Sequence, residues 1–114
     1  MADSIFTKII NKEIPAKIRY EDDNFIVIDD INPVAPVHVL IITKKPFETL
    51  ESINSDDELN IKFIPLVRKI AKQLGIQENY KFFMNVGKRV QQVPHVHLHL
   101  YGGWKQGDII RELD

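Results

Sequence analysis

Positions 95 to 100 alternate strictly between histidine and apolar side chains: His95, His97 and His99 are separated by Val96, Leu98 and Leu100. Successive side chains of a β-strand point to opposite faces of the sheet. The pattern therefore predicts a strand at 95–101 whose three imidazoles share one face while the apolar side chains cover a core on the other. The fourth histidine, His38, opens another predicted strand at 38–43.

The rest of the chain predicts a small mixed domain. Further strands are expected at 18–21, 25–29 and 81–86, a short helix after Ser4, and a long helix from about 59 to 74 that follows a capping box at 55–58. Most connections are too short for parallel crossovers. The 114 residues, 44% of them hydrophobic, suit one domain spanning 1–114. We expect an α+β fold: a five-stranded antiparallel sheet with one long and one short helix packed on one face.

Charge and composition exclude several classes of protein. The formal net charge is −1, so no bulk field draws the chain to nucleic acid or to an acidic membrane. The absence of cysteine excludes disulfides and thiol catalysis. Residues 1–4 do not resemble a signal peptide, and no apolar stretch approaches the length of a membrane span. We expect a soluble, cytoplasmic protein with no nucleic-acid or membrane partner.

Three imidazoles in a row favour a functional role, because each ring needs partners for two nitrogens. One alternative is a zinc site in which His38 adds a ligand from a neighbouring strand. However, the backbones of His95 and His99 would lie ~13 Å apart on one strand face, so one ion hardly needs all three.

The other alternative is phosphate chemistry. Neutral imidazole is a good nucleophile near pH 7 and can form a covalent bond to phosphorus. His97, the central histidine, would attack, and His95 and His99 would hydrogen-bond phosphate oxygens or pass a proton to the leaving group. On their own, Asn85 and Asp30 are weaker candidates, for a phosphate contact and a ribose contact respectively.

The segment 95–101 resembles the signature of the histidine-triad (HIT) family. Similar blocks of the Hint-like branch of that family match nearly the whole chain: Ile5-Phe6-Thr7-Lys8-Ile9-Ile10, Glu13-Ile14-Pro15-Ala16, Ile28-Asp29-Asp30-Ile31-Asn32-Pro33, Ala35-Pro36-Val37-His38, Phe83-Met84-Asn85-Val86-Gly87 and Gly102-Gly103.

The resemblance implies a homodimer that hydrolyses purine nucleoside phosphoramidates through a nucleotidyl-histidine intermediate, with no metal or other cofactor. His97 matches the nucleophile, His95 and His99 its flanking triad members, and His38 the fourth histidine that supports them. The resemblance also assigns substrate contacts: Asn85 to phosphate, Asp30 to ribose, and Ile5, Phe6, Ile14, Ile28 and Ile31 to the base pocket.

The segment before the triad departs from the family pattern. Gln92 stands where the family has a serine or threonine that helps bind phosphate and handle the leaving group. Glutamine donates and accepts hydrogen bonds but has no hydroxyl proton to give. Two functions therefore stay open: a phosphoramidate hydrolase, and a purine-nucleotide-binding or partner-binding module with little catalysis.

Overall fold

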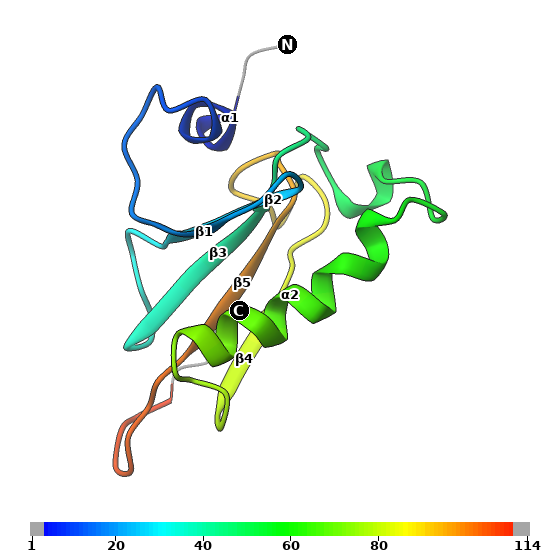
Figure 1. The fold of residues 1–114 in the computed structure, drawn as a ribbon. Helices are drawn as coiled ribbons and strands as arrows, with labels where there is room; N and C mark the ends of the chain where they lie inside the picture. Colours follow the sequence, from blue (N-terminus) through cyan, green and yellow to red (C-terminus); the bar gives the residue numbers. More distant parts are fainter. Residues whose placement is uncertain (1–3, 111–114) are drawn as a thin grey trace.

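The computed structural model describes residues 4–110. In chain order the elements are α1 (Ile5–Ile10), β1 (Ile18–Glu21), β2 (Phe25–Asp29), β3 (Val37–Thr43), the 3-10 helix η1 (Leu50–Ser52), α2 (Leu59–Gln73), β4 (Tyr80–Phe83) and β5 (His97–Gly102). The five strands form one antiparallel sheet in the order β1-β2-β3-β5-β4 (Figure 1). The α+β class and the five-stranded antiparallel sheet are thus confirmed.

The first core lies between the sheet and α2. The alternate residues Phe25 and Val27 of β2 point to this side, where the apolar stripe of the long helix packs on them. The buried helix residues are Leu59, Phe63, Leu66, Val67, Ile70 and Ala71. Val96, Leu98 and Leu100 join the same core, which confirms that the apolar side chains of the histidine segment face inward.

The second core lies on the opposite face, under α1. Ile26 and Ile28, the other alternate residues of β2, pack there with Phe6 and Ile9 of the short helix. Figure 1 shows α1 and α2 on opposite sides of the sheet. The expectation that both helices pack on one face was therefore wrong. Both faces of this sheet carry apolar side chains, and a helix packs on each face to bury them.

The helix ends differ in detail from the sequence prediction. Ser4 caps α1, since its hydroxyl accepts a hydrogen bond from the Thr7 backbone N–H at 3.1 Å. At α2, the side chain that accepts a backbone N–H is Asp57, 2.9 Å from the nitrogen of Leu59, so the predicted capping box at 55–58 does not form. Beyond α2, Gly75 adopts φ +72°, as expected of a glycine that ends a helix.

The end of β5 requires glycine. A Cβ on Gly102 would lie 2.6 Å from the carbonyl oxygen of Asn79, a distance that real side chains do not tolerate. Gly102 pairs with Tyr80 at the start of β4, so the missing side chain lets the outer strand lie beside β5. Within residues 4–110, no helix has the length and apolarity needed to cross a membrane.

Candidate active site

Strand pairing brings three of the four histidines together on the α1 face. β3 and β5 are neighbours, with His99 opposite Leu40 and His38 opposite Tyr101. The rings of His97 and His99 lie 5.2 Å apart between centroids, and those of His99 and His38 lie 5.3 Å apart. The shared imidazole face predicted from the sequence therefore forms, and His38 extends it from the adjacent strand.

The His97 ring is held by the backbone carbonyl of His95, two residues earlier. Its Nδ1 lies 2.7 Å from the carbonyl oxygen of His95, and because a carbonyl only accepts, Nδ1 carries the proton. In the neutral ring, Nε2 then keeps its lone pair, and it has no hydrogen-bond partner among residues 4–110. Burial lowers the pKa of His97, against the raising effects of the His95 carbonyl and of Asp30. The ring is therefore neutral near pH 7, with the lone pair of Nε2 available to a ligand.

His95 lies just before β5 rather than within it, so the predicted strand start at 95 was too early. The side chain is buried, with a relative exposure of 1%, and burial lowers its pKa. Nε2 lies 2.7 Å from the Thr43 carbonyl oxygen and Nδ1 lies 2.8 Å from the Ser4 hydroxyl. Both nitrogens have protein partners, so in this arrangement His95 has no nitrogen to offer to a phosphate, unlike the sequence expectation.

His38 and His99 form a hydrogen-bonded pair with a defined direction. The Val34 backbone N–H donates to Nδ1 of His38 at 3.2 Å, so the ring proton of neutral His38 is on Nε2. That proton is donated to Nδ1 of His99 at 3.0 Å. His99 therefore carries its own proton on Nε2, which has no hydrogen-bond partner among residues 4–110.

The electrostatics keep this pair neutral. Burial, with smaller contributions from His97 and His38, lowers the pKa of His99 to about 4. Burial also lowers the pKa of His38, although Asp30 opposes it. Phe83 of β4 stacks on His99 with 4.6 Å between ring centroids and 5° between planes, which fixes the plane of the imidazole.

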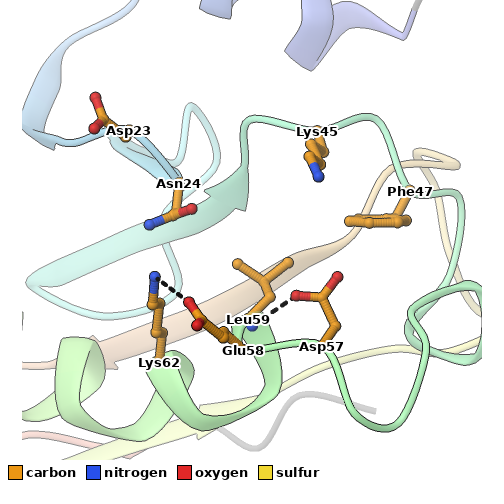
Figure 2. A pocket seen from close by; sticks show the side chains of 8 residues that line it. All are labelled: Asp23, Asn24, Lys45, Phe47, Asp57, Glu58, Leu59 and Lys62. Atoms are coloured by element: carbon orange, nitrogen blue, oxygen red, sulfur yellow. Dashed lines mark hydrogen bonds and ion pairs between the residues drawn. The ribbon is translucent and has the colours of Figure 1, made fainter.

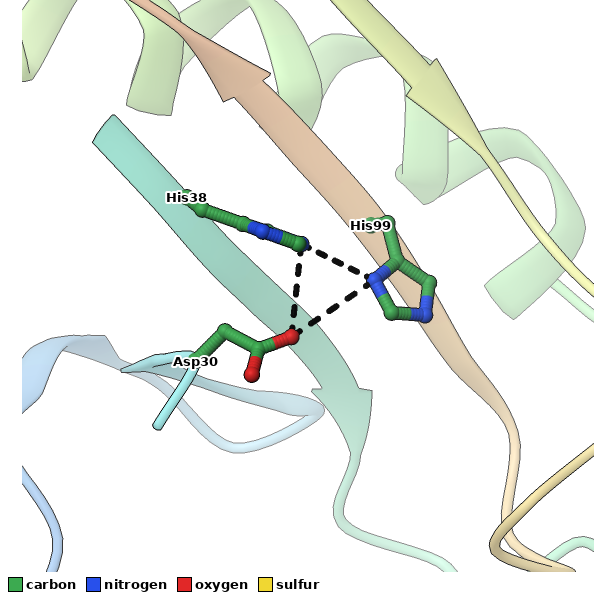
Figure 3. Close-up of side chains that lie close together, drawn as sticks. All are labelled: Asp30, His38 and His99. Atoms are coloured by element: carbon green, nitrogen blue, oxygen red, sulfur yellow. Dashed lines mark hydrogen bonds and ion pairs between the residues drawn. The ribbon is translucent and has the colours of Figure 1, made fainter. Parts of the chain in front are cut away.

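Asp30 lies beside the same pair, as Figure 3 shows. Its Oδ2 is 3.3 Å from Nε2 of His38 and 3.8 Å from Nδ1 of His99. Its Oδ1 accepts a hydrogen bond from the Asn32 backbone N–H at 2.8 Å, which stabilises the turn after β2. The structure therefore brings the predicted ribose-binding acid to the histidines, with one carboxylate oxygen engaged in a turn.

Asp30, His38 and His99 also meet a first geometric test for a metal site, since their ligand atoms lie within 4.8 Å of one another. The donor chemistry disfavours it. A metal-bound histidine ordinarily donates the proton of its other nitrogen to an acceptor. Nδ1 of His38 instead receives the Val34 N–H, so Nε2 holds the ring proton and offers no lone pair to a cation. The cluster fits a hydrogen-bond relay better than a zinc site.

The apolar residues expected to line a base pocket divide into three groups. Phe6 is buried with its ring edge-on to His97, 4.9 Å between centroids, so α1 packs beside this imidazole. Ile28 is buried in the same cluster, and Ile14 packs against it while partly exposed. Ile5 is 48% exposed and Ile31 90% exposed. The structure thus brings Phe6, Ile14 and Ile28 together in one apolar cluster, whereas Ile5 and Ile31 are exposed to solvent.

The loop between β4 and β5 holds the two remaining predicted residues. Asn85 is partly buried and Gln92 is exposed, and neither side chain hydrogen-bonds to another residue in the described part of the chain. Gln91 holds this loop instead: its Oε1 accepts from the Gly87 N–H, and its Nε2 donates to the carbonyl oxygens of Glu48 and Val93. The sequence pointed to Gln92 because of its place in the motif and gave no sign of the role of Gln91.

A separate hollow of about 270 Å³ lies at the start of α2 and contains no histidine (Figure 2). An ion pair and a side-chain-to-backbone hydrogen bond lie within it: Lys62 pairs with Glu58 at 3.6 Å, and Asp57 accepts from the backbone N–H of Leu59 at 2.9 Å. The lining of the hollow has no counterpart of the row of imidazoles on the triad face.

Comparisons with other proteins identify the family and agree with the fold. A HIT-like protein of Synechocystis sp. is 45% identical over 103 residues, which cover 89% of this chain and 90% of that protein. A HIT family hydrolase from Clostridium thermocellum has a TM-score of 0.84 at 40% identity, covering 97% of this chain and 99% of that one. A histidine triad nucleotide-binding protein from Candida albicans has a TM-score of 0.77 at 33% identity, covering 98% and 87%. The HIT domain itself matches residues 11–106, and this chain belongs to the HIT-domain family.

Proposed function

We propose that this protein hydrolyses purine nucleoside phosphoramidates at the α-phosphate through a nucleotidyl intermediate on His97. The observation that carries the proposal is the protonation pattern of that ring. Nδ1 is tied to the His95 carbonyl and Nε2 has a lone pair with no partner among residues 4–110. A buried, neutral imidazole fixed in this way is pre-organised to attack phosphorus.

The reaction has two steps. In the first, Nε2 of His97 forms a bond to phosphorus while the phosphorus–nitrogen bond breaks, and the departing amine takes up one proton from water. In the second, water attacks phosphorus, the bond to Nε2 breaks, and the proton of the attacking water is released. His99 is placed to donate its Nε2–H to a phosphate oxygen and to stabilise the charge that builds there.

Residues around the triad support a nucleotide as the substrate. Asp30 lies next to the histidines with a carboxylate suited to ribose hydroxyls, and Asn85 offers an amide to phosphate from the loop after β4. Phe6 and Ile14 supply apolar surface near His97 for a base. The Candida albicans relative is described as nucleotide-binding, which favours the same ligand class here.

We also propose that two copies pair through β4. This strand is at the edge of the sheet, with one side not covered by another strand of the described chain. Phe82 on β4 is 43% exposed, which is unusual for a large aromatic residue in a strand. Pairing of β4 with β4 of a second copy joins the two sheets and covers this side chain.

The test is AMP release from adenosine 5′-phosphoramidate in the presence of EDTA. Wild type should release AMP, and His97→Ala should lose about a thousandfold or more of that rate, because it lacks the nucleophile. Gln77→Ala, at an exposed site beyond α2, is the matched control and should keep full activity. Equal rates for wild type and His97→Ala would reject the proposal.

One observation favours a second candidate, a purine-nucleotide-binding module with little catalysis. Gln92 is exposed and brings no hydroxyl to the loop that precedes the triad. If the protein is a binding module, calorimetry will show AMP binding that depends on Asp30, while turnover stays at the His97→Ala level. Turnover well above that level excludes it.

A further inference from the structure

The Ser4 hydroxyl has two roles in this structure. It accepts a hydrogen bond from the Thr7 backbone N–H at 3.1 Å and so caps α1. The same oxygen lies 2.8 Å from Nδ1 of His95, 91 positions later in the chain. The first residue before α1 therefore contacts a member of the triad directly.

The direction of the second contact follows from the other nitrogen of His95. Nε2 lies 2.7 Å from the Thr43 carbonyl oxygen, which can only accept, so Nε2 carries the proton. In the neutral ring, Nδ1 is then an acceptor, and the Ser4 O–H must donate to it. The Thr7 hydroxyl, 3.5 Å from Nδ1, is at the limit of hydrogen-bond distance and contributes less.

His95 in turn positions His97, because its backbone carbonyl accepts the Nδ1–H of His97 at 2.7 Å. The side chain of His95 is buried and clamped between Thr43 on β3 and Ser4 before α1. Because both ring nitrogens of His95 are hydrogen-bonded, the residue is held in place. Its backbone carbonyl, which accepts the Nδ1–H of His97, is held with it.

We propose that Ser4 is a positioning residue of the triad: its hydroxyl donates to Nδ1 of His95 and, together with the Thr43 carbonyl, fixes that ring so that the His95 backbone carbonyl stays in place to accept the Nδ1–H of His97. The kinetic consequence rests on the proposed hydrolase function, whereas the ring protonation does not. Ser4 has no contact with the reacting nitrogen, so its effect reaches the chemistry only through His95.

Capping and positioning are separable by substitution. Ser4→Asp keeps the cap, since aspartate caps helices about as well as serine, but its carboxylate cannot donate to Nδ1. With acceptors at both nitrogens, His95 is driven to bind a second proton. Ser4→Ala removes the cap and the donor together, and Ser4→Thr keeps both. Lys8→Ala, at an exposed position of α1, is the control for changes in the helix itself.

The first measurement is nitrogen-15 NMR of the imidazoles across a pH titration. Wild type, Ser4→Thr and Lys8→Ala should show His95 neutral with the proton on Nε2, and His97 with the proton on Nδ1. Ser4→Asp should keep His95 protonated to a higher pH. Ser4→Ala should keep the proton on Nε2, which the Thr43 carbonyl still accepts, but should shift the Nδ1 resonance, because that nitrogen loses its donor. An unchanged Nδ1 resonance in Ser4→Ala together with unchanged His95 protonation in Ser4→Asp would overturn the proposal, whatever the enzyme does.

The second measurement is steady-state kinetics with adenosine 5′-phosphoramidate. Loss of one hydrogen bond worth about 1 kcal/mol should lower kcat about 3- to 10-fold in Ser4→Ala and Ser4→Asp with little change in KM, and Ser4→Thr should restore it. Equal kcat values in all four variants of an active enzyme would also overturn the proposal. If wild type shows no turnover, the hydrolase proposal fails by itself, and the NMR result alone decides the role of Ser4.

Discussion

Nδ1 of His97 and the backbone carbonyl oxygen of His95 are 2.7 Å apart, and this contact determines which nitrogen of His97 bears the proton. A main-chain acceptor does not titrate, so the tautomer is independent of pH as long as the ring stays neutral. The alternation of histidine and apolar residues thus does more than place imidazoles on one face: it brings one triad member into position to orient the next.

The pH dependence of turnover should reflect the buried state of His97. Burial lowers its pKa from the ordinary value of 6.5, so the reactive neutral ring persists at pH values where a free histidine is protonated. We expect kcat, after subtraction of the His97→Ala rate, to stay level as the pH falls through 6.5 and to drop only in more acidic solution. A half-maximal rate at pH 6.5 would contradict this placement of the ring.

Stability should fall in acid for the same reason. The pKa of His99 is lowered from 6.5 to about 4, so between these values the unfolded chain binds a proton that the folded chain does not. The free energy of unfolding therefore rises with pH across this window and falls as the pH decreases, by up to about 1.4 kcal/mol per pH unit for one group. Urea unfolding should show this slope for wild type.

His99→Gln is the comparison for that slope, since glutamine retains hydrogen-bonding capacity without titrating. The variant should show a shallower dependence between pH 6.5 and about 4, with His38, His95 and His97 supplying what remains. Parallel curves for the two proteins would mean that His99 titrates alike in the folded and unfolded chains.

Gln92→Ser tests whether the loop lacks a proton donor. Gln92 is exposed and has no side-chain hydrogen bond within residues 4–110, so replacing it breaks no hydrogen bond there. A serine hydroxyl there should raise kcat about 2- to 10-fold, because one hydrogen bond to the leaving group becomes available. Gln92→Ala is the control and should give no gain. Equal rates for Gln92→Ser and Gln92→Ala would show that no hydroxyl is needed at this position.

Substitution of Phe82 tests the edge strand. Phe82→Asp puts a charge on β4 at the proposed contact between copies, where desolvation of a carboxylate is costly. Wild type should sediment as a dimer and Phe82→Asp as a monomer in analytical ultracentrifugation. Ile110→Asp, which places the same charge at another half-exposed apolar residue, should leave the dimer intact. A monomeric wild type would contradict the proposed pairing.

Short sequence patterns predicted the features that depend only on neighbouring residues, namely which faces of single strands and helices are buried. The alternation around His97 predicted both the imidazole face and the buried row of Leu98 and Leu100, because strand geometry needs only neighbouring residues. The buried face of α2 was also predicted, because its apolar residues recur every three or four positions. The sequence did not show that β2 buries both of its faces, so the helices were expected on one side.

The site was predicted less completely, because its decisive contacts join distant positions. Ser4 meets His95 across 91 residues, and Thr43 meets it across 52. Nothing in the sequence around Ser4 distinguishes a helix cap from a triad partner. Likewise, Gln91 and Gln92 are chemically alike in the sequence, and only the fold shows that Gln91 bonds to Glu48 while Gln92 faces solvent.

The most direct test of the central claim is a search for the covalent intermediate on His97. The enzyme would be mixed with adenosine 5′-phosphoramidate, quenched in alkali, where phosphorus–nitrogen bonds to histidine survive, and digested for mass spectrometry. Wild type should yield one adenylyl group on the peptide that contains His97, with fragment ions that assign it to that ring, and His97→Ala should yield none. AMP release by wild type without any such adduct, or with the adenylyl group on His99, would contradict the account.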